Sequence, residues 1–76
     1  MARLEETIAK ALLLPEERIT DDLAYNSIPE WDSVAHMALV AELEDSYEVM
    51  LETDDIVDMS SVAKIRTILG KYGVSA

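Results

Sequence analysis

The chain of 76 residues contains no cysteine. Without a thiol of its own it can form no disulfide bond, no thiolate metal site and no cysteine nucleophile, so thiol chemistry would require an added group. Half of its residues are hydrophobic, which is enough for a core that needs neither metals nor disulfides. Residues 1–76 are therefore expected to form a single domain, too small to combine a core with a deep catalytic cleft.

Basic residues are scarce as well. Six Lys and Arg stand against sixteen Asp and Glu, which gives a formal net charge of −10. This charge repels the phosphates of nucleic acids and of anionic membrane surfaces, so neither is an expected partner. Protein surfaces rich in Lys and Arg are the expected partners instead.

Long hydrophobic runs are absent. The three leucines at positions 12–14 are too few for the core of a signal peptide, and the sequence shows no membrane-spanning segment and no lipidation motif. The expected location is the cytoplasm. Nothing in the pattern indicates an obligate oligomer, so a monomer is expected.

Apolar residues recur at helical spacing in four parts of the chain. The spacing predicts helices over residues 2–14, from about Ser33 to Tyr47, within Thr53–Met59, and from after Ser60 to about Tyr72. The expected fold is all-α: a small antiparallel four-helix bundle of three longer helices and a short third one. Residues 15–31 are expected to form a long loop.

Particular residues are expected to set the ends of these elements. Pro15 should end the first helix because the residue before a proline avoids the helical region. Thr53 could cap the third helix, and Gly73 is a suitable stop for the last one. Three apolar residues of the loop should dip into the core: Ile19, Leu23 and Ile28.

The helix expected at residues 33–47 has two apolar sides. One side is a normal core face, with His36 and Ser46 beside four core residues: Leu39, Val40, Leu43 and Tyr47. The opposite side carries Val34, Met37, Ala38 and Ala41, with acidic residues around them. A helix of a small bundle needs one buried face only, so the second side predicts a docking surface. Its expected members are Val34, Met37, Ala41, Glu44, Asp45 and Glu48. The alternative is that the alanines only favour helix formation and Met37 packs against a loop.

Ser33 is the candidate site of modification. Asp32 is a good N-cap, which puts Ser33 on the first turn of the helix with its hydroxyl exposed. The positive end of a helix suits a phosphate ester. An exposed serine in this position, in a very acidic helical chain, predicts a site that another enzyme modifies.

The segment Asp32-Ser33-Val34 resembles the Asp-Ser-Leu motif of the acyl carrier protein family. The resemblance covers nearly the whole chain and is weakest in residues 15–31. The further matching positions are Leu39, Val40, Leu43, Glu44, Asp45, Tyr47, Ile56 and Met59, together with Ser-Ser-Val at residues 60–62 where the family has Thr-Thr-Val.

This resemblance implies a carrier protein that catalyses nothing itself. A phosphopantetheinyl transferase, using coenzyme A and Mg²⁺, would esterify the Ser33 hydroxyl with 4′-phosphopantetheine. The thiol of that arm would hold an acyl or aminoacyl group as a thioester, at a raised effective concentration for each docked enzyme. The implied partners are the transferase, a loading ligase and acyltransferase-type enzymes with basic docking surfaces.

The chain departs from the fatty-acid carriers at several positions. Val34 replaces the leucine of the motif, and Ala35, His36 and Ala38 stand where acidic residues are common in that group. The approach through Trp31 is more similar to carriers of specialised pathways, such as polyketide, peptide or surface-polysaccharide assembly. We therefore expect a specialised pathway rather than bulk fatty-acid synthesis.

The family can shelter an acyl chain between its helices. The positions that would line such a pocket here are Leu43, Ile56, Met59 and Ile65. Ile56 and Ile65 are large where fatty-acid carriers often have small residues. The resemblance therefore implies a small or polar cargo that stays outside.

Two other interpretations compete with the carrier. A non-covalent acidic adaptor that binds basic proteins would use the same exposed helix side without modification of Ser33. A hydrolase built on Ser33, His36 and Asp32 lacks oxyanion donors, and side chains on consecutive turns of one helix point outward in parallel. His36 is instead expected to be partly buried or to dock a partner. Trp31 is expected to pack against the start of the helix, against His36 in one arrangement.

The acidic residues Asp54, Asp55 and Asp58 do not form a calcium loop. An EF-hand requires a glycine at its sharp turn and a glutamate at its twelfth position, and both are missing. No dedicated metal site is expected.

Overall fold

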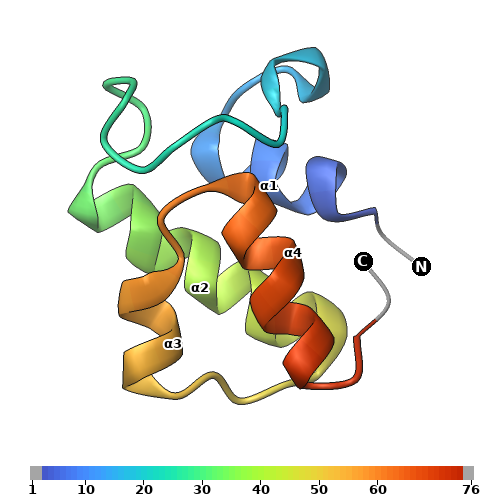
Figure 1. Ribbon diagram of the computed structural model, residues 1–76. Helices are drawn as coiled ribbons and strands as arrows, with labels where there is room; N and C mark the ends of the chain where they lie inside the picture. The colour runs from blue at the N-terminus through green and yellow to red at the C-terminus, as the bar shows by residue number, and fades with distance from the viewer. Residues whose placement is uncertain (1–2, 75–76) are drawn as a thin grey trace.

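The computed structural model describes residues 3–74 as an all-helical globule (Figure 1). Its α-helices are α1 (Leu4–Leu12), α2 (Ser33–Tyr47), α3 (Thr53–Asp58) and α4 (Val62–Lys71), and a short 3-10 helix, η1, covers Glu16–Arg18. Within this part of the chain no β-strand is found, and an isolated bridge joins Ala24 to Ser61. The expected all-α class is confirmed.

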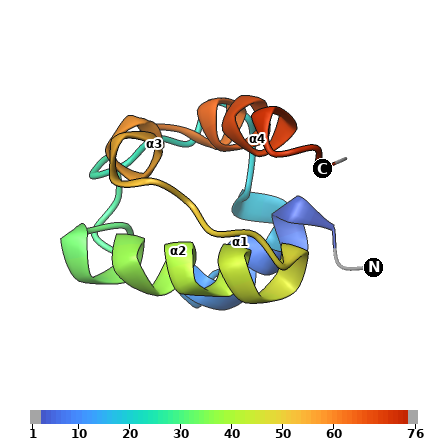
Figure 2. The same cartoon turned by 90° about the horizontal axis from the view of Figure 1, so that it is seen from below.

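The helices lie in two layers. Figure 2 shows α1 and α2 in one layer and α3 and α4 in the other, with the connection after α2 running between the layers. The apolar faces of both layers meet in a single core. Its most deeply buried side chains are Leu4, Ile8, Trp31, Leu39, Leu43, Met59, Val62, Ile65 and Leu69.

The bounds predicted for the second helix are confirmed. Asp32 is its N-cap, and the Asp32 carboxylate accepts a hydrogen bond of 2.9 Å from the Ala35 N–H. The last helix begins after Ser61, whose hydroxyl caps the Lys64 N–H at 3.2 Å. Gly73 follows that helix with a φ of +79°, the left-handed geometry that glycine adopts most easily.

Two other helix ends differ from the prediction. The first helix ends at Leu12 rather than at residue 14, because Leu13 adopts a left-handed conformation with a φ of 59°. The chain therefore turns before Pro15 rather than at it. The cap of α3 is Glu52, which makes no side-chain capping bond, and Thr53 is the first residue inside the helix.

The middle of the long connection between α1 and α2 is held against the core and the start of α4. Ile19 is buried, and Leu23 and Ile28 are half-buried against the core, as expected for anchoring residues. Backbone hydrogen bonds join it to the start of α4: Tyr25 N–H donates to Ser60 O at 2.9 Å, and Val62 N–H donates to Leu23 O at 3.0 Å. These bonds hold the loop beside the segment that joins α3 to α4.

A buried carboxylate fixes α3 to α4. Asp55 is 8% exposed and accepts hydrogen bonds from the Lys71 ammonium at 2.7 Å and from the Tyr72 hydroxyl at 2.5 Å. The same Tyr72 oxygen accepts from the Glu52 N–H at 3.0 Å. These two hydrogen bonds hold the pKa of Asp55 below its ordinary value, and the bond from Lys71 has the larger effect.

This contact should make the stability of the protein sensitive to acid. A carboxylate with a lowered folded-state pKa contributes stability above its unfolded-state pKa of about 3.9, and loses it as the pH falls through the folded-state value. We expect Asp55→Asn to be less stable than wild type at neutral pH. The difference should shrink as the pH falls below the unfolded-state pKa of about 3.9. Urea unfolding across this range tests it, and a constant difference would contradict the assignment.

Candidate functional site

Ser33 is exposed at the first position of α2. The Asp32 carboxylate and carbonyl accept the N–H groups of Ala35 and His36, so the N–H groups of Ser33 and Val34 have no acceptor inside the helix. Within residues 3–74 the Ser33 hydroxyl makes no hydrogen bond. A free hydroxyl at a positive helix end is a suitable acceptor for a phosphate ester.

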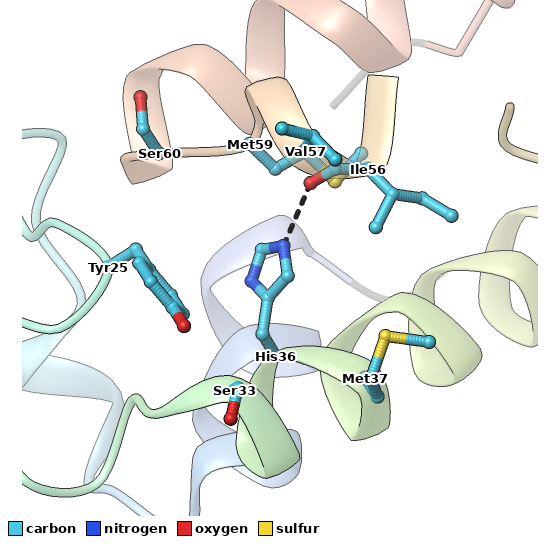
Figure 3. Close-up of a pocket in the computed structure, with 8 residues that line it drawn as sticks. All are labelled: Tyr25, Ser33, His36, Met37, Ile56, Val57, Met59 and Ser60. Carbon is cyan, nitrogen blue, oxygen red and sulfur yellow. Dashed lines mark hydrogen bonds between the residues drawn. The ribbon is translucent and has the colours of Figure 1, made fainter. Parts of the chain in front are cut away.

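A hollow of about 340 Å³ opens beside Ser33 between α2, α3 and the long loop. Figure 3 shows the residues of α2 on one wall and those of α3 and its C-terminal continuation on the other. Tyr25 reaches the hollow from the loop. Its lining, which is largely apolar, consists of Tyr25, Ser33, His36, Met37, Ile56, Val57, Met59 and Ser60.

Half of the predicted pocket residues line this hollow. Ile56 and Met59 do so. Leu43 and Ile65 do not, because both are 0% exposed and are packed on all sides in the core. The free space therefore lies at the surface near Ser33 and does not extend into the core between Leu43 and Ile65.

His36, which lines this hollow, contacts both the loop and α3. The Trp31 indole N–H donates to His36 Nδ1 at 3.0 Å, and His36 Nε2 lies 2.9 Å from the Ile56 carbonyl oxygen. Trp31 is 0% exposed, and its ring lies edge to edge with the imidazole across this hydrogen bond, with the ring planes 22° apart and the centroids 6.2 Å apart. The expected packing of Trp31 against the start of α2 and His36 is confirmed.

The same contacts argue against a Ser-His-Asp triad. Both ring nitrogens of His36 are engaged with groups other than the Ser33 hydroxyl, and the Asp32 carboxylate caps the helix rather than orienting the imidazole. In this arrangement His36 has no free nitrogen to accept a proton from Ser33.

The apolar side of α2 that was predicted to dock a partner is exposed. Val34 is 78% exposed and Met37 is 59% exposed, and Ala38 and Ala41 are exposed as well. On α3, at the other wall of the hollow, Val57 is 76% exposed. The apolar surface around Ser33 thus includes a residue of α3 that the α2 pattern alone does not reveal.

The acidic residues beside this surface have different environments. Asp45 and Glu48 are exposed, as docking residues would be. Glu44 is half-buried, and its carboxylate accepts a hydrogen bond of 2.9 Å from the Leu51 N–H. Because that bond holds the connection between α2 and α3, the Glu44 carboxylate is committed to the fold.

Residues 3–74 contain no group of three His, Asp or Glu side chains placed to hold a metal ion. No helix among these residues has both the length and the apolar character needed to cross a bilayer.

The site thus consists of a free serine hydroxyl on a capped helix, a hollow beside it, and exposed apolar residues on α2 and α3. Comparison with known proteins gives no significant match to any family model, any curated protein or any solved structure.

Proposed function

We propose that this chain is a non-catalytic carrier protein. It holds acyl or aminoacyl groups as thioesters on a 4′-phosphopantetheine arm attached to Ser33 and presents them to the enzymes of a specialised pathway. The observation that carries the proposal is the exposed, unbonded Ser33 hydroxyl at a capped helix start, beside a hollow and an exposed apolar surface. The order of the helices, three longer ones and a short third, supports the small antiparallel four-helix bundle expected from the sequence.

The residues present fit the arm. Ser33 offers its hydroxyl to the phosphate, and the Asp32 cap fixes the first turn so that the hydroxyl faces solvent. When bound, the arm supplies a thiol whose thioester keeps the acyl carbon activated. The chain itself has no cysteine to supply one.

The surface around Ser33 supports recognition by basic partners. Val34, Met37 and Val57 offer apolar contacts on α2 and α3, and Asp45 and Glu48 offer negative charge at the C-terminal end of α2. Partners with an apolar centre and a Lys- or Arg-rich rim would be complementary in both respects. These include the phosphopantetheinyl transferase, a loading ligase and acyltransferase-type enzymes.

The cargo in this proposal is small or polar and remains outside the core. Leu43 and Ile65, which would have to separate to admit a chain, are completely buried. We expect the melting temperature of the carrier to be nearly the same with a short and with a long acyl group. A long-chain form with a strongly raised melting temperature would show that the core opens around its cargo.

Intact-mass spectrometry tests the proposal. The folded chain is incubated with coenzyme A, Mg²⁺ and a broad-specificity phosphopantetheinyl transferase, and Ser33→Ala is the control. We expect the wild type to gain the mass of a single phosphopantetheine and the variant to gain none.

The second candidate function is a non-covalent adaptor for basic proteins. The observation that favours it is the exposed apolar side of α2 with its neighbouring carboxylates, which needs no prosthetic group to bind a partner. Absence of any mass gain with several transferases, on a chain shown to be folded, would select the adaptor.

A further inference from the structure

The imidazole of His36 connects three parts of the molecule around the hollow. It belongs to α2, it accepts from Trp31 at the end of the loop, and it contacts the Ile56 carbonyl oxygen of α3. Figure 3 shows the ring standing between the two walls of the hollow, with its bond to Ile56 drawn. Both walls of the space beside Ser33 are therefore joined through one side chain.

The partners of the ring determine where its proton lies. An indole N–H can only donate, so Nδ1 must carry a lone pair, and a carbonyl oxygen can only accept, so Nε2 must carry the hydrogen. The neutral ring with hydrogen on Nε2 satisfies both contacts. A proton added to Nδ1 would direct two N–H groups at each other across the 3.0 Å contact with Trp31.

We propose that neutral His36 is a latch that fixes the loop and α3 around the hollow, and that proton uptake on Nδ1 opens it. The indole N–H of the fully buried Trp31 would then lose its acceptor, a costly state that the loop can relieve by moving. The significance of this latch for an arm on Ser33 rests on the proposed function. The latch itself is a property of the unmodified chain.

The charges around the ring offer a cationic His36 little compensation. Tyr25 faces the ring from the loop, with centroids 5.2 Å apart, and is the other titratable residue that lines the hollow. On α2, Asp32 is engaged in the helix cap. On α3, Asp55 is engaged with Lys71 and Tyr72. The remaining acids of α3, Asp54 and Asp58, are exposed and do not line the hollow.

The composition of the chain makes the latch measurable. It contains a single histidine and a single tryptophan, so the ring nitrogens of His36 and the indole N–H of Trp31 each give one assignable NMR signal. The unmodified, ¹⁵N-labelled chain is titrated through the protonation of His36. The ¹⁵N shifts of the ring report the tautomer, and hydrogen exchange reports opening at Trp31 and along residues 56–59.

At high pH we expect Nδ1 to give the shift of an unprotonated nitrogen and Nε2 that of a protonated one. After correction for the intrinsic pH dependence of exchange, protonation should speed exchange of the Trp31 indole and the α3 amides by about tenfold or more. In His36→Phe, which keeps a ring but makes neither bond, corrected exchange at these sites should be fast and independent of pH.

A neutral ring with its hydrogen on Nδ1 would overturn the proposal. So would corrected exchange rates at residues 56–59 that stay constant while the His36 shifts titrate. Both readouts use the wild type, so they remain decisive even where His36→Phe does not fold. They also need no transferase, so failure of Ser33 to accept an arm would refute the carrier and leave this result standing.

Discussion

Replacement of Trp31 by alanine should remove a large part of the folding stability of the protein. The side chain is 0% exposed, donates a hydrogen bond to His36 and meets the Tyr25 ring edge-on at 6.4 Å. Loss of a buried tryptophan costs about 3–5 kcal/mol, and small domains are stable by only about 0.05–0.15 kcal/mol per residue. Urea unfolding followed by far-ultraviolet circular dichroism measures the loss.

Trp31→Phe separates packing from hydrogen bonding in this experiment. Phenylalanine fills much of the same space but leaves His36 Nδ1 without its donor, so an intermediate loss is expected. A Trp31→Ala variant as stable as wild type would show that the loop and α2 hold together without the tryptophan, contrary to its central place in the core.

Introduction of a positive charge at Met37 should strongly impair recognition of Ser33. Met37 is 59% exposed and lines the hollow beside the serine. A lysine there removes an apolar contact and repels a basic partner, and both changes weaken binding. We expect Met37→Lys to lower the kcat/KM for phosphopantetheine transfer by about tenfold or more.

Met50→Lys is the matched control. Met50 is 86% exposed and lies beyond the C-terminal end of α2, away from Ser33 at its start, and the substitution changes the net charge by the same amount. It should leave kcat/KM close to the wild-type value. Equal losses at the two positions would attribute the effect to net charge alone, and no loss at either would place Met37 outside the partner contact.

The sequence predicts the helices well where capping and periodicity agree. The bounds of α2 follow from Asp32, a side chain that caps, and from the apolar residues that repeat behind it. The same reasoning finds the anchors of the long loop, because isolated apolar residues in a polar stretch have to be buried somewhere. The exposed side of α2 is also foreseen, since Val34 and Met37 lie opposite its core face.

Other features depend on packing between distant segments. The left-handed turn at Leu13 replaces the stop expected at Pro15, because the local pattern does not show where the chain must bend to close on the core. Glu44 resembles its acidic neighbours in sequence, yet it binds the Leu51 N–H. The periodicity of α2 places Glu44 and Asp45 in the same acidic group. It does not show that Glu44 contacts backbone that comes later in the chain.

The hollow could be predicted only in part for the same reason. Ile56 and Met59 follow from the family resemblance, whereas Tyr25 comes from an irregular loop and Val57 from the outer side of a two-turn helix. His36 was expected to be partly buried, but its two partners come from the loop and from α3. Such contacts between separate segments carry no local signal.

If Ser33 carries the proposed arm, the modified chain gains a thiol, and the composition of the chain allows this thiol to be measured directly. Because the chain has no cysteine, a thiol titration reads zero before modification. After incubation with coenzyme A, Mg²⁺ and a phosphopantetheinyl transferase, followed by removal of coenzyme A, we expect a single reactive thiol per wild-type chain and none in Ser33→Ala. A folded wild type that gains no thiol from several transferases, or a Ser33→Ala variant that gains one, would contradict the assignment.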